Sequence, residues 1–158
     1  YLAYPAKLYQ MRYGPAMQAR KYYEQIRQEF DLPRIFLEVE MTQQDMMEAT
    51  LSLLDQYPGI TAFVSFNGDV TVGVLKALTM RGLRVPADIS VIGLATDHIA
   101  NLMIPALTSI DFPTHHMGYQ AAKALIQILE KEPGTEILQE LVVPELRIRE
   151  SSGPARTW

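Results

Sequence analysis

Apolar residues along the chain follow two alternating patterns: short continuous runs, and longer stretches in which they recur at helical spacing. The continuous runs predict strands at residues 1–4, 34–39, 60–66, 89–94 and 107–112. The helical spacing predicts helices at residues 15–32, 43–57, 69–81, 98–103 and 114–131. Because strands that alternate with helices form βαβ units, the pattern predicts an α/β fold with a parallel sheet covered by helices on both faces.

Local signals place several helix ends. Thr42, with Asp45 three residues later, predicts a capped start of the second helix. The Asn-Gly pair at 67–68 predicts a turn, after which Asp69 can cap the next helix. Gly82 is the residue type expected immediately after the end of that helix.

The distribution of apolar residues also predicts which surfaces are buried. The run at 60–66 is apolar almost throughout, as expected of a strand buried on both faces of a parallel sheet. In the first helix, the residues that share an apolar face are Ala19, Tyr22, Tyr23, Ile26 and Phe30. The helix that begins near Thr114 is apolar over about half of its circumference. That surface fits either a helix packed between sheet and loops or a contact with another subunit or a missing lobe.

The composition excludes several kinds of site. The chain has 158 residues, a formal net charge of −4, no cysteine and three histidines. Disulfides and thiolate chemistry are excluded, a histidine-rich metal site is disfavoured, and no cofactor is expected. The acidic balance offers no surface that would collect nucleic-acid phosphates. Phosphate-loop, dinucleotide, serine-nucleophile and zinc-protease motifs are absent from the sequence, so no enzyme is predicted.

The apolar runs and the start of the sequence indicate whether the protein enters a membrane and whether the chain is part of a longer protein. No run approaches the roughly 18–20 residues that span a bilayer, and no leader-like segment precedes the first strand, so we expect no membrane partner. Since the sequence is strand-like from its first residue, we expect a longer protein whose N-terminal part is missing. Residues 151–158 are expected to form a flexible tail.

Candidate ligand contacts follow from the predicted topology. In open α/β sheets, ligands bind at the carboxyl ends of the strands, where the turns converge. The candidates after the predicted strands are Arg12, Met41, Asn67, Ala95, Asp97 and Phe112. The Asn67 amide suits sugar hydroxyls but fits a turn equally well, and Asp97 fits a helix cap better than a ligand contact. Met41 and Phe112 suit a ring face, although such residues more often lie in a core.

Four segments carry a family resemblance. They are ITAFVSFNGDVTVGVLKAL, RGLRVPADISVIGL, IPALTSIDFPTHHMGYQAAKALIQIL and ELRIRESS, all between residues 60 and 152. In this order they resemble the C-terminal part of the lactose-repressor (LacI/GalR) family of transcription regulators. The first sixty residues fit the βαβ unit that precedes it in that family more loosely.

The resemblance implies a class I periplasmic-binding-protein-like domain of two Rossmann-like, doubly wound lobes with a small-molecule effector in the cleft between them. Residues 1–150 would belong to this effector-binding and dimerisation domain, mainly to its C-terminal lobe, and residues 108–131 would cross toward the first lobe. Most of the first lobe and the helix-turn-helix domain that binds operator DNA would lie outside the chain. The implied protein is a cytoplasmic homodimer; a periplasmic sugar or solute receptor of a transport system, which shares the fold, is the alternative.

The ligand residues of the family are only partly matched here. Asn67 matches the asparagine of the family's Asn-Asp pair, whereas Gly68 replaces the aspartate, and the sugar-gripping aspartate falls on Ala95. The arginine position of the family falls near Arg12, and its aromatic stacking position falls on Met41. The polar position that follows the LTSI strand falls on Phe112. Each lost hydrogen bond to a charged group weakens binding by about 1.5–3 kcal/mol, or tenfold and more, so we expect a pocket less polar than the family norm.

A homodimer surface is implied on the helix at 69–81 and the one that follows. Val72 and Met80 point away from the core-facing arc of their helix. With the corresponding helices of relatives as the guide, the predicted interface residues are Val72, Met80, Ile99, Leu102 and Met103.

Overall fold

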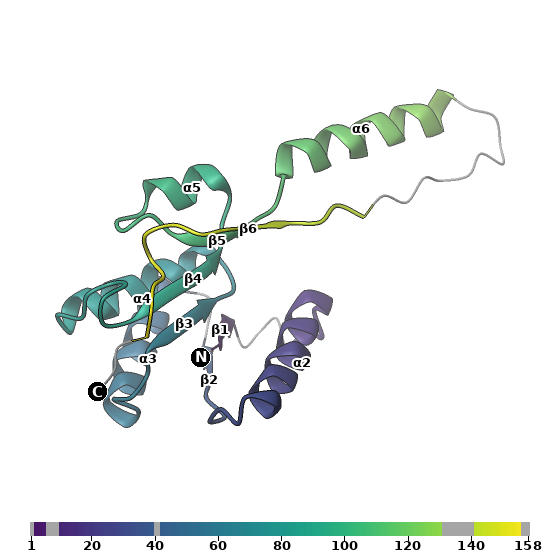
Figure 1. Cartoon of the computed structure of the whole chain (residues 1–158). Helices are drawn as coiled ribbons and strands as arrows, with labels where there is room; N and C mark the ends of the chain where they lie inside the picture. Colours follow the sequence, from purple (N-terminus) through teal and green to yellow (C-terminus); the bar gives the residue numbers. More distant parts are fainter. Residues whose placement is uncertain (1, 6–9, 40–41, 131–140, 156–158) are drawn as a thin grey trace.

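A computed structural model describes residues 2–5, 10–39, 42–130 and 141–155 of the chain. In this part of the chain six strands form one sheet, in the order β2-β1-β3-β4-β5-β6 (Figure 1). The strands are β1 (Leu2–Pro5), β2 (Phe36–Val39), β3 (Ala62–Ser65), β4 (Ser90–Leu94), β5 (Thr108–Asp111) and β6 (Glu145–Arg147). The first five are parallel and β6 is antiparallel to β5. The predicted α/β fold with a mainly parallel sheet is confirmed.

The helices lie between the strands in sequence. They are α2 (Gly14–Glu29), α3 (Gln43–Gln56), α4 (Gly68–Met80), α5 (Asp97–Leu102) and α6 (Thr114–Glu130). The predicted cap of α3 is confirmed, since the Thr42 hydroxyl accepts a hydrogen bond from the Asp45 amide at 3.1 Å. Gly82 follows α4 with a φ of +67°, where a side chain would be strained. Within the described residues, no helix is both long and apolar enough for a membrane crossing.

Helices α3 and α4 pack against each other and cover one face of the sheet (Figure 1). On that face Met46 of α3, Phe63 of β3 and Leu78 of α4 are buried. Strand β3 alternates, because Phe63 is fully buried whereas Val64 is 41% exposed. The prediction that residues 60–66 are buried on both faces is therefore wrong: among the described helices, none packs closely on the other face of β3.

Helix α2 contacts β1, and its apolar residues are largely open to solvent. Tyr22, Ile26 and Phe30 are 58%, 48% and 63% exposed. The Tyr23 hydroxyl donates to the carbonyl oxygen of Ile35 at 3.1 Å, which ties α2 to the start of β2. The amphipathic pattern thus predicts the helix correctly, while much of its apolar surface stays uncovered.

Helix α6 projects away from the rest of the sheet (Figure 1). No residue of this helix is buried, and Leu125, Ile126 and Leu129 are 57%, 53% and 76% exposed. Of the two interpretations of its apolar surface, packing between sheet and loops is therefore wrong. Within the described residues, the apolar surface of α6 is not buried by any other element.

The segment after β6 is bonded to the starts of β4 and β5. Ser151 is fully buried; its carbonyl oxygen accepts from the Val91 amide and its hydroxyl accepts from the Thr108 amide, both at 2.8 Å. The Gly153 amide donates to Ser90 Oγ at 3.1 Å. The expectation of a flexible tail from residue 151 onward is wrong for residues 151–153, because hydrogen bonds hold them against β4 and β5. Residues 156–158 lie outside the described part.

Candidate functional site

The carboxyl ends of the parallel strands meet at one edge of the sheet, called here the carboxyl edge. The register aligns Ser65 of β3 with Gly93 of β4, so the residues after these strands are neighbours. The predicted residues that directly follow β3, β4 and β5 are Asn67, Ala95, Asp97 and Phe112. Arg12 lies in the exposed turn before α2, with a φ of +53°. Met41 lies outside the described residues.

The Asn67 side chain has a structural role. Its Oδ1 accepts from the Val70 amide at 2.8 Å, which makes Asn67 the cap of α4. The prediction that Asp69 is this cap is wrong; Asp69 lies in the first turn of α4 and accepts from Gln43 Nε2 at 3.2 Å. The amide nitrogen is the part of the Asn67 side chain that remains for a ligand, since it has no hydrogen bond with a described residue.

Beneath the carboxyl edge, two buried hydroxyl groups pair with each other. Ser65 Oγ and Thr71 Oγ1 lie 2.5 Å apart. A Cβ on Gly93 would lie 2.6 Å from Ser65 Oγ and 2.8 Å from Thr71 Oγ1, so the close approach of β4 requires glycine. These hydroxyls hold the edge together and are not directed to a ligand.

Ala95 brings no polar group to the site. Its methyl group is half-buried and packs against the main core. Thr96, the next residue, is the cap of α5 in an extended conformation and makes no side-chain capping bond. The position that the resemblance assigns to a sugar-gripping carboxylate is thus filled by an apolar contact.

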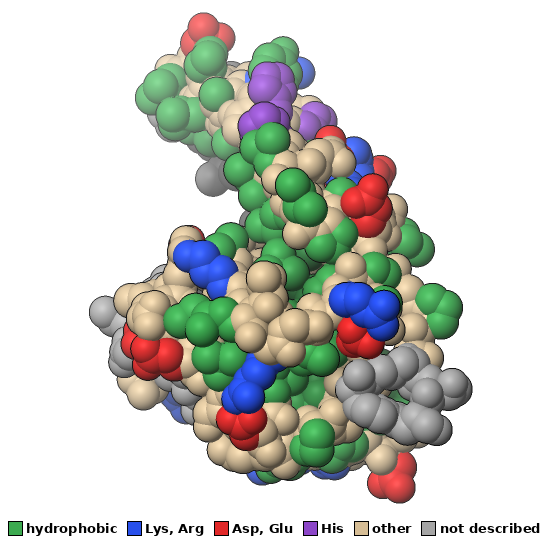
Figure 2. All heavy atoms as spheres, turned by 90° about the vertical axis from the view of Figure 1, so that its left-hand side faces the viewer, with side chains coloured by type: hydrophobic (Ala, Val, Ile, Leu, Met, Phe, Trp, Pro, Cys, Tyr) green, Lys and Arg blue, Asp and Glu red, His purple; other side chains and the backbone are tan. Residues whose placement is uncertain are grey.

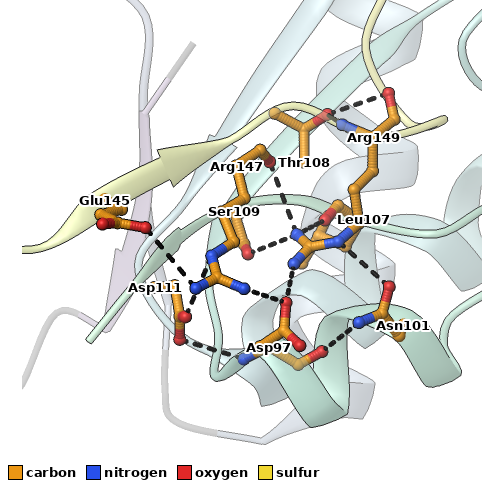
Figure 3. A network of polar contacts seen from close by, with 9 residues as sticks. All are labelled: Asp97, Asn101, Leu107, Thr108, Ser109, Asp111, Glu145, Arg147 and Arg149. Atoms are coloured by element: carbon orange, nitrogen blue, oxygen red, sulfur yellow. Dashed lines mark hydrogen bonds and ion pairs between the residues drawn. The ribbon is translucent and has the colours of Figure 1, made fainter. Parts of the chain in front are cut away.

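Asp97 is the first residue of α5, and its carboxylate is paired with two arginines (Figure 3). Its Oδ1 lies 2.8 Å from Arg147 Nη1 and 2.5 Å from Arg149 Nη2. The Asp97 amide donates to Asp111 Oδ1 at 3.0 Å. The prediction that Asp97 caps α5 is wrong, because Thr96 is the cap, and the Asp97 carboxylate is neutralised within the protein.

The two arginines join the returning strand β6 to the carboxyl edge. Arg149, with 12% of its side chain exposed, also donates to Leu107 O at 2.7 Å, Ser109 Oγ at 2.9 Å and Asn101 Oδ1 at 3.2 Å (Figure 3). Arg147 lies 3.3 Å from Asp111 Oδ2. Sequence reasoning missed both arginines, although they stand two residues apart at the end of β6 and just after it, a spacing that places side chains of an extended chain on one face.

These arginines change the acidity of Asp97. Hydrogen bonding from Arg149, and then from Arg147, lowers the pKa of the carboxyl group, while partial desolvation opposes the shift. A carboxyl whose pKa is lower in the folded state stabilises the fold above its unfolded pKa of about 3.9. That contribution is lost as the pH falls through the folded value.

Asp97→Asn is therefore expected to lower the free energy of unfolding at neutral pH, by an amount that shrinks as the pH falls below about 3.9. Urea unfolding followed by circular dichroism over this range measures the difference. Glu145→Gln is the control, because this exposed carboxylate lies 3.5 Å from Arg147 and is expected to contribute little. A pH-independent effect of Asp97→Asn would contradict the ion-pair role.

The carboxyl edge combines apolar side chains with polar groups, several of which are bonded within the protein. Two of its carboxylates, Asp97 and Asp111, are paired with arginine, and a third, Asp69, accepts from Gln43. Phe112 is 40% exposed and Ala95 is half-buried. In the described residues, no group of three or more histidine, aspartate or glutamate side chains is placed to hold a metal ion. The Phe112 ring and the Asn67 amide nitrogen are the candidate groups at this edge that remain exposed or without a bond to a described residue.

The predicted dimer residues lie on the side of the molecule formed by α4 and α5. Val72, Met80 and Met103 line a shallow apolar hollow of about 380 Å³, together with Ile104, which is 94% exposed. Ile99 and Leu102 of α5 are 44% and 65% exposed. Figure 2, which faces the left-hand side of Figure 1, shows hydrophobic side chains gathered between charged ones. We call this surface the α4–α5 surface.

The sheet has five parallel strands, and helix α6 follows the last of them at the carboxyl edge. This architecture agrees with the comparison to known families. The family model of the periplasmic binding protein-like domain matches residues 5–152. The chain belongs to this family. Within the periplasmic binding protein-like family, the relatives of the chain identify it as an effector-binding portion of the LacI/GalR type.

These relatives are named as regulators. The ribose operon repressor of Halalkalibacterium halodurans is 27% identical over 135 residues, which are 83% of this chain and 41% of the relative. The transcriptional repressor PurR of Haemophilus influenzae is 35% identical over 121 residues, or 75% of this chain and 36% of the relative. A LacI family regulator from Arthrobacter sp. FB24, solved in complex with lactose, has a TM-score of 0.75 at 27% identity, covering 84% of this chain and 50% of that one.

The comparisons confirm the LacI/GalR resemblance. The two curated relatives are named as repressors and not as enzymes. This periplasmic binding protein-like chain spans about two fifths of their length.

Proposed function

We propose that the chain is the effector-binding and dimerisation part of a LacI-type transcription regulator that acts in the cytoplasm. A small molecule binds between this lobe and a first lobe, and its binding modulates how a helix-turn-helix domain outside these residues holds operator DNA. The observation that carries the proposal is that the chain leaves the carboxyl edge through α6 and returns to it through β6. In this proposal the ligand binds at the carboxyl edge, which is also where the crossing segments leave and return.

The crossing segment supports a second lobe beyond this edge. The apolar residues Leu125, Ile126 and Leu129 of α6 are exposed, so they need a cover that the described residues do not supply. Residues 108–131 cross to the first lobe in this proposal, and the first lobe covers α6. On the return, Arg147 and Arg149 fasten β6 to Asp97 of α5.

The effector is less polar than a free sugar in this proposal. The Arthrobacter relative is solved with lactose, and the Halalkalibacterium relative is named for a ribose operon. Here the carboxylates of Asp97 and Asp111 are already paired with arginine, and Ala95 supplies no acceptor. The exposed ring of Phe112 favours an effector with a planar or apolar face.

Calorimetry on the full-length protein, with both lobes present, tests this function. We expect at least one compound in a set of aromatic and heterocyclic compounds to bind the protein. Ribose, arabinose and lactose are expected to bind weakly. Ala95→Asp is expected to strengthen sugar binding by about tenfold or more, because a carboxylate returns to the edge. Ala155→Asp, an exposed site after β6, is the matched control and is expected to change nothing.

Tight binding of a free monosaccharide by the unsubstituted protein would contradict the less polar pocket. Equal effects of Ala95→Asp and Ala155→Asp would contradict the placement of the effector at the carboxyl edge. A periplasmic receptor of a transport system shares the fold, but the names of the relatives favour the regulator.

A further inference from the structure

Helix α5 is too short to hold its own conformation. It has six residues, whereas isolated helices shorter than about 12–15 residues are marginal in water. Its cap, Thr96, makes no side-chain capping bond. Ala100 is the one buried residue among these six, and it adds a single methyl group to the main core. Contacts from outside the helix must therefore keep α5 in place.

Arg149 is fixed to β5 through both its backbone and its side chain. It follows β6 by two residues, and its amide donates to Thr108 Oγ1 at 2.8 Å. Its Nη1 donates to Leu107 O at 2.7 Å and to Ser109 Oγ at 2.9 Å. The guanidinium is thereby held on the β5 side, with its other donors still to be used.

Those other donors reach two successive turns of α5 (Figure 3). Arg149 Nη2 donates to Asp97 Oδ1, and its Nε donates to Asn101 Oδ1 at 3.2 Å. A guanidinium is planar and its donors diverge in fixed directions, so bonding on both sides fixes the position of α5 against β5. Arg147 also bonds to Asp97, but 44% of its side chain is exposed against 12% for Arg149, so water competes more with its bond.

Helix α5 also lies between the two surfaces of the proposed function. Its first residue follows Ala95 of the carboxyl edge by two positions, and the Asp97 amide donates to Asp111 Oδ1 at 3.0 Å. Its exposed residues Ile99 and Leu102 belong to the α4–α5 surface. A shift of α5 against β5 would therefore move both surfaces.

We propose that Arg149 is the positioning residue of α5, which it holds to β5 from the strand that returns from the crossing. Through α5 it sets the placement of the carboxyl edge and of the α4–α5 surface. The hold on α5 depends on the contacts of Arg149 alone, whereas its consequence for dimerisation rests on the proposed function.

Hydrogen exchange in the full-length protein, with no ligand added, tests the hold on α5. The Ala100 amide, bonded to Thr96 O at 2.9 Å, reports on α5, and the Tyr57 amide, bonded to Leu53 O at 2.8 Å, reports on α3. Arg149→Met removes every side-chain donor at similar length. We expect the Ala100 amide to exchange about tenfold faster or more relative to the Tyr57 amide, because bonds from a charged group are lost. Taking this ratio cancels any global loss of stability.

Arg84→Met is the matched control, because Arg84 makes a two-bonded ion pair with Asp88, at 3.0 and 3.3 Å, outside α5. It is expected to leave the exchange ratio unchanged. Arg149→Lys keeps the charge, but one ammonium cannot bond to both β5 and α5, so a smaller rise is expected. This variant also provides the measurement if Arg149→Met does not fold. An unchanged ratio in the Arg149 variants, or an equal rise in Arg84→Met, would overturn the proposal.

Light scattering of the same variants tests the consequence for the α4–α5 surface. We expect Arg149→Met to raise the dissociation constant of the homodimer several-fold and Arg84→Met to leave it unchanged. A homodimer unaffected by Arg149→Met would overturn the link between Arg149 and this surface. An unsubstituted protein that remains monomeric would instead contradict the proposed dimerisation, and the exchange ratio would still decide whether Arg149 holds α5.

Discussion

Phe63→Ala is expected to lower the free energy of unfolding by about 3–5 kcal/mol, the range for removing a buried aromatic side chain. Phe63 is fully buried at the centre of β3, among apolar residues from α3, α4 and β4. The covering helices cannot collapse fully into the vacated volume, so the cavity adds to the loss of apolar burial. Urea unfolding of the variant and the unsubstituted protein measures the difference.

Val64→Ala is the neighbouring control for this prediction. Val64 points to the other face of β3, where it is 41% exposed, so its truncation is expected to cost less than about 1 kcal/mol. The pair therefore tests the one-sided burial of the strand. Equal losses for the two variants would show that the open face is covered in solution.

The double substitution Val72→Asp and Met80→Asp is expected to dissociate the proposed homodimer. Both residues line the apolar hollow of the α4–α5 surface. A two-fold interface would bury four unpaired carboxylates, each at a cost of several kcal/mol, and 1.4 kcal/mol corresponds to tenfold in affinity. We expect the dissociation constant to rise by at least about a thousandfold.

Light scattering of the protein and the double variant at equal concentration measures this change. Tyr22→Asp with Ile26→Asp adds the same charge to the exposed face of α2 and is expected to leave the mass unchanged. A dimer mass for the Val72→Asp, Met80→Asp protein would contradict the assignment of the interface.

Helix ends were predictable from sequence where a single residue and its near neighbours determine the backbone. Thr42 caps α3 through an amide three residues away, and Gly82 adopts the positive φ that glycine tolerates. The cap of α4 was misplaced by two residues, because Asn67 and Asp69 are both good capping types. Only the backbone geometry shows that the side chain of Asn67 reaches the Val70 amide.

The candidate site was predictable in position but only partly in its chemistry. Asn67, Ala95 and Phe112 lie along one edge as expected, because the βαβ pattern makes β3, β4 and β5 parallel and parallel strands end at the same edge of the sheet. The pairing of Asp97 with Arg149 could not be read from spacing, since 52 residues separate them in sequence. Without that pairing, Asp97 looked like a cap or a free ligand group.

By itself, the sequence determined the α/β class, the order of most elements and the family, because these depend on periodicity, turn residues and motifs that are local in the chain. Only the tertiary structure decided which apolar surfaces are covered. Phe63 is buried and Val64 is exposed although both belong to one apolar run, since α3 and α4 pack on a single face. It likewise decided that Ser151 is buried and bonded to β4 and β5, because its partners Val91 and Thr108 come from distant segments that meet only after folding.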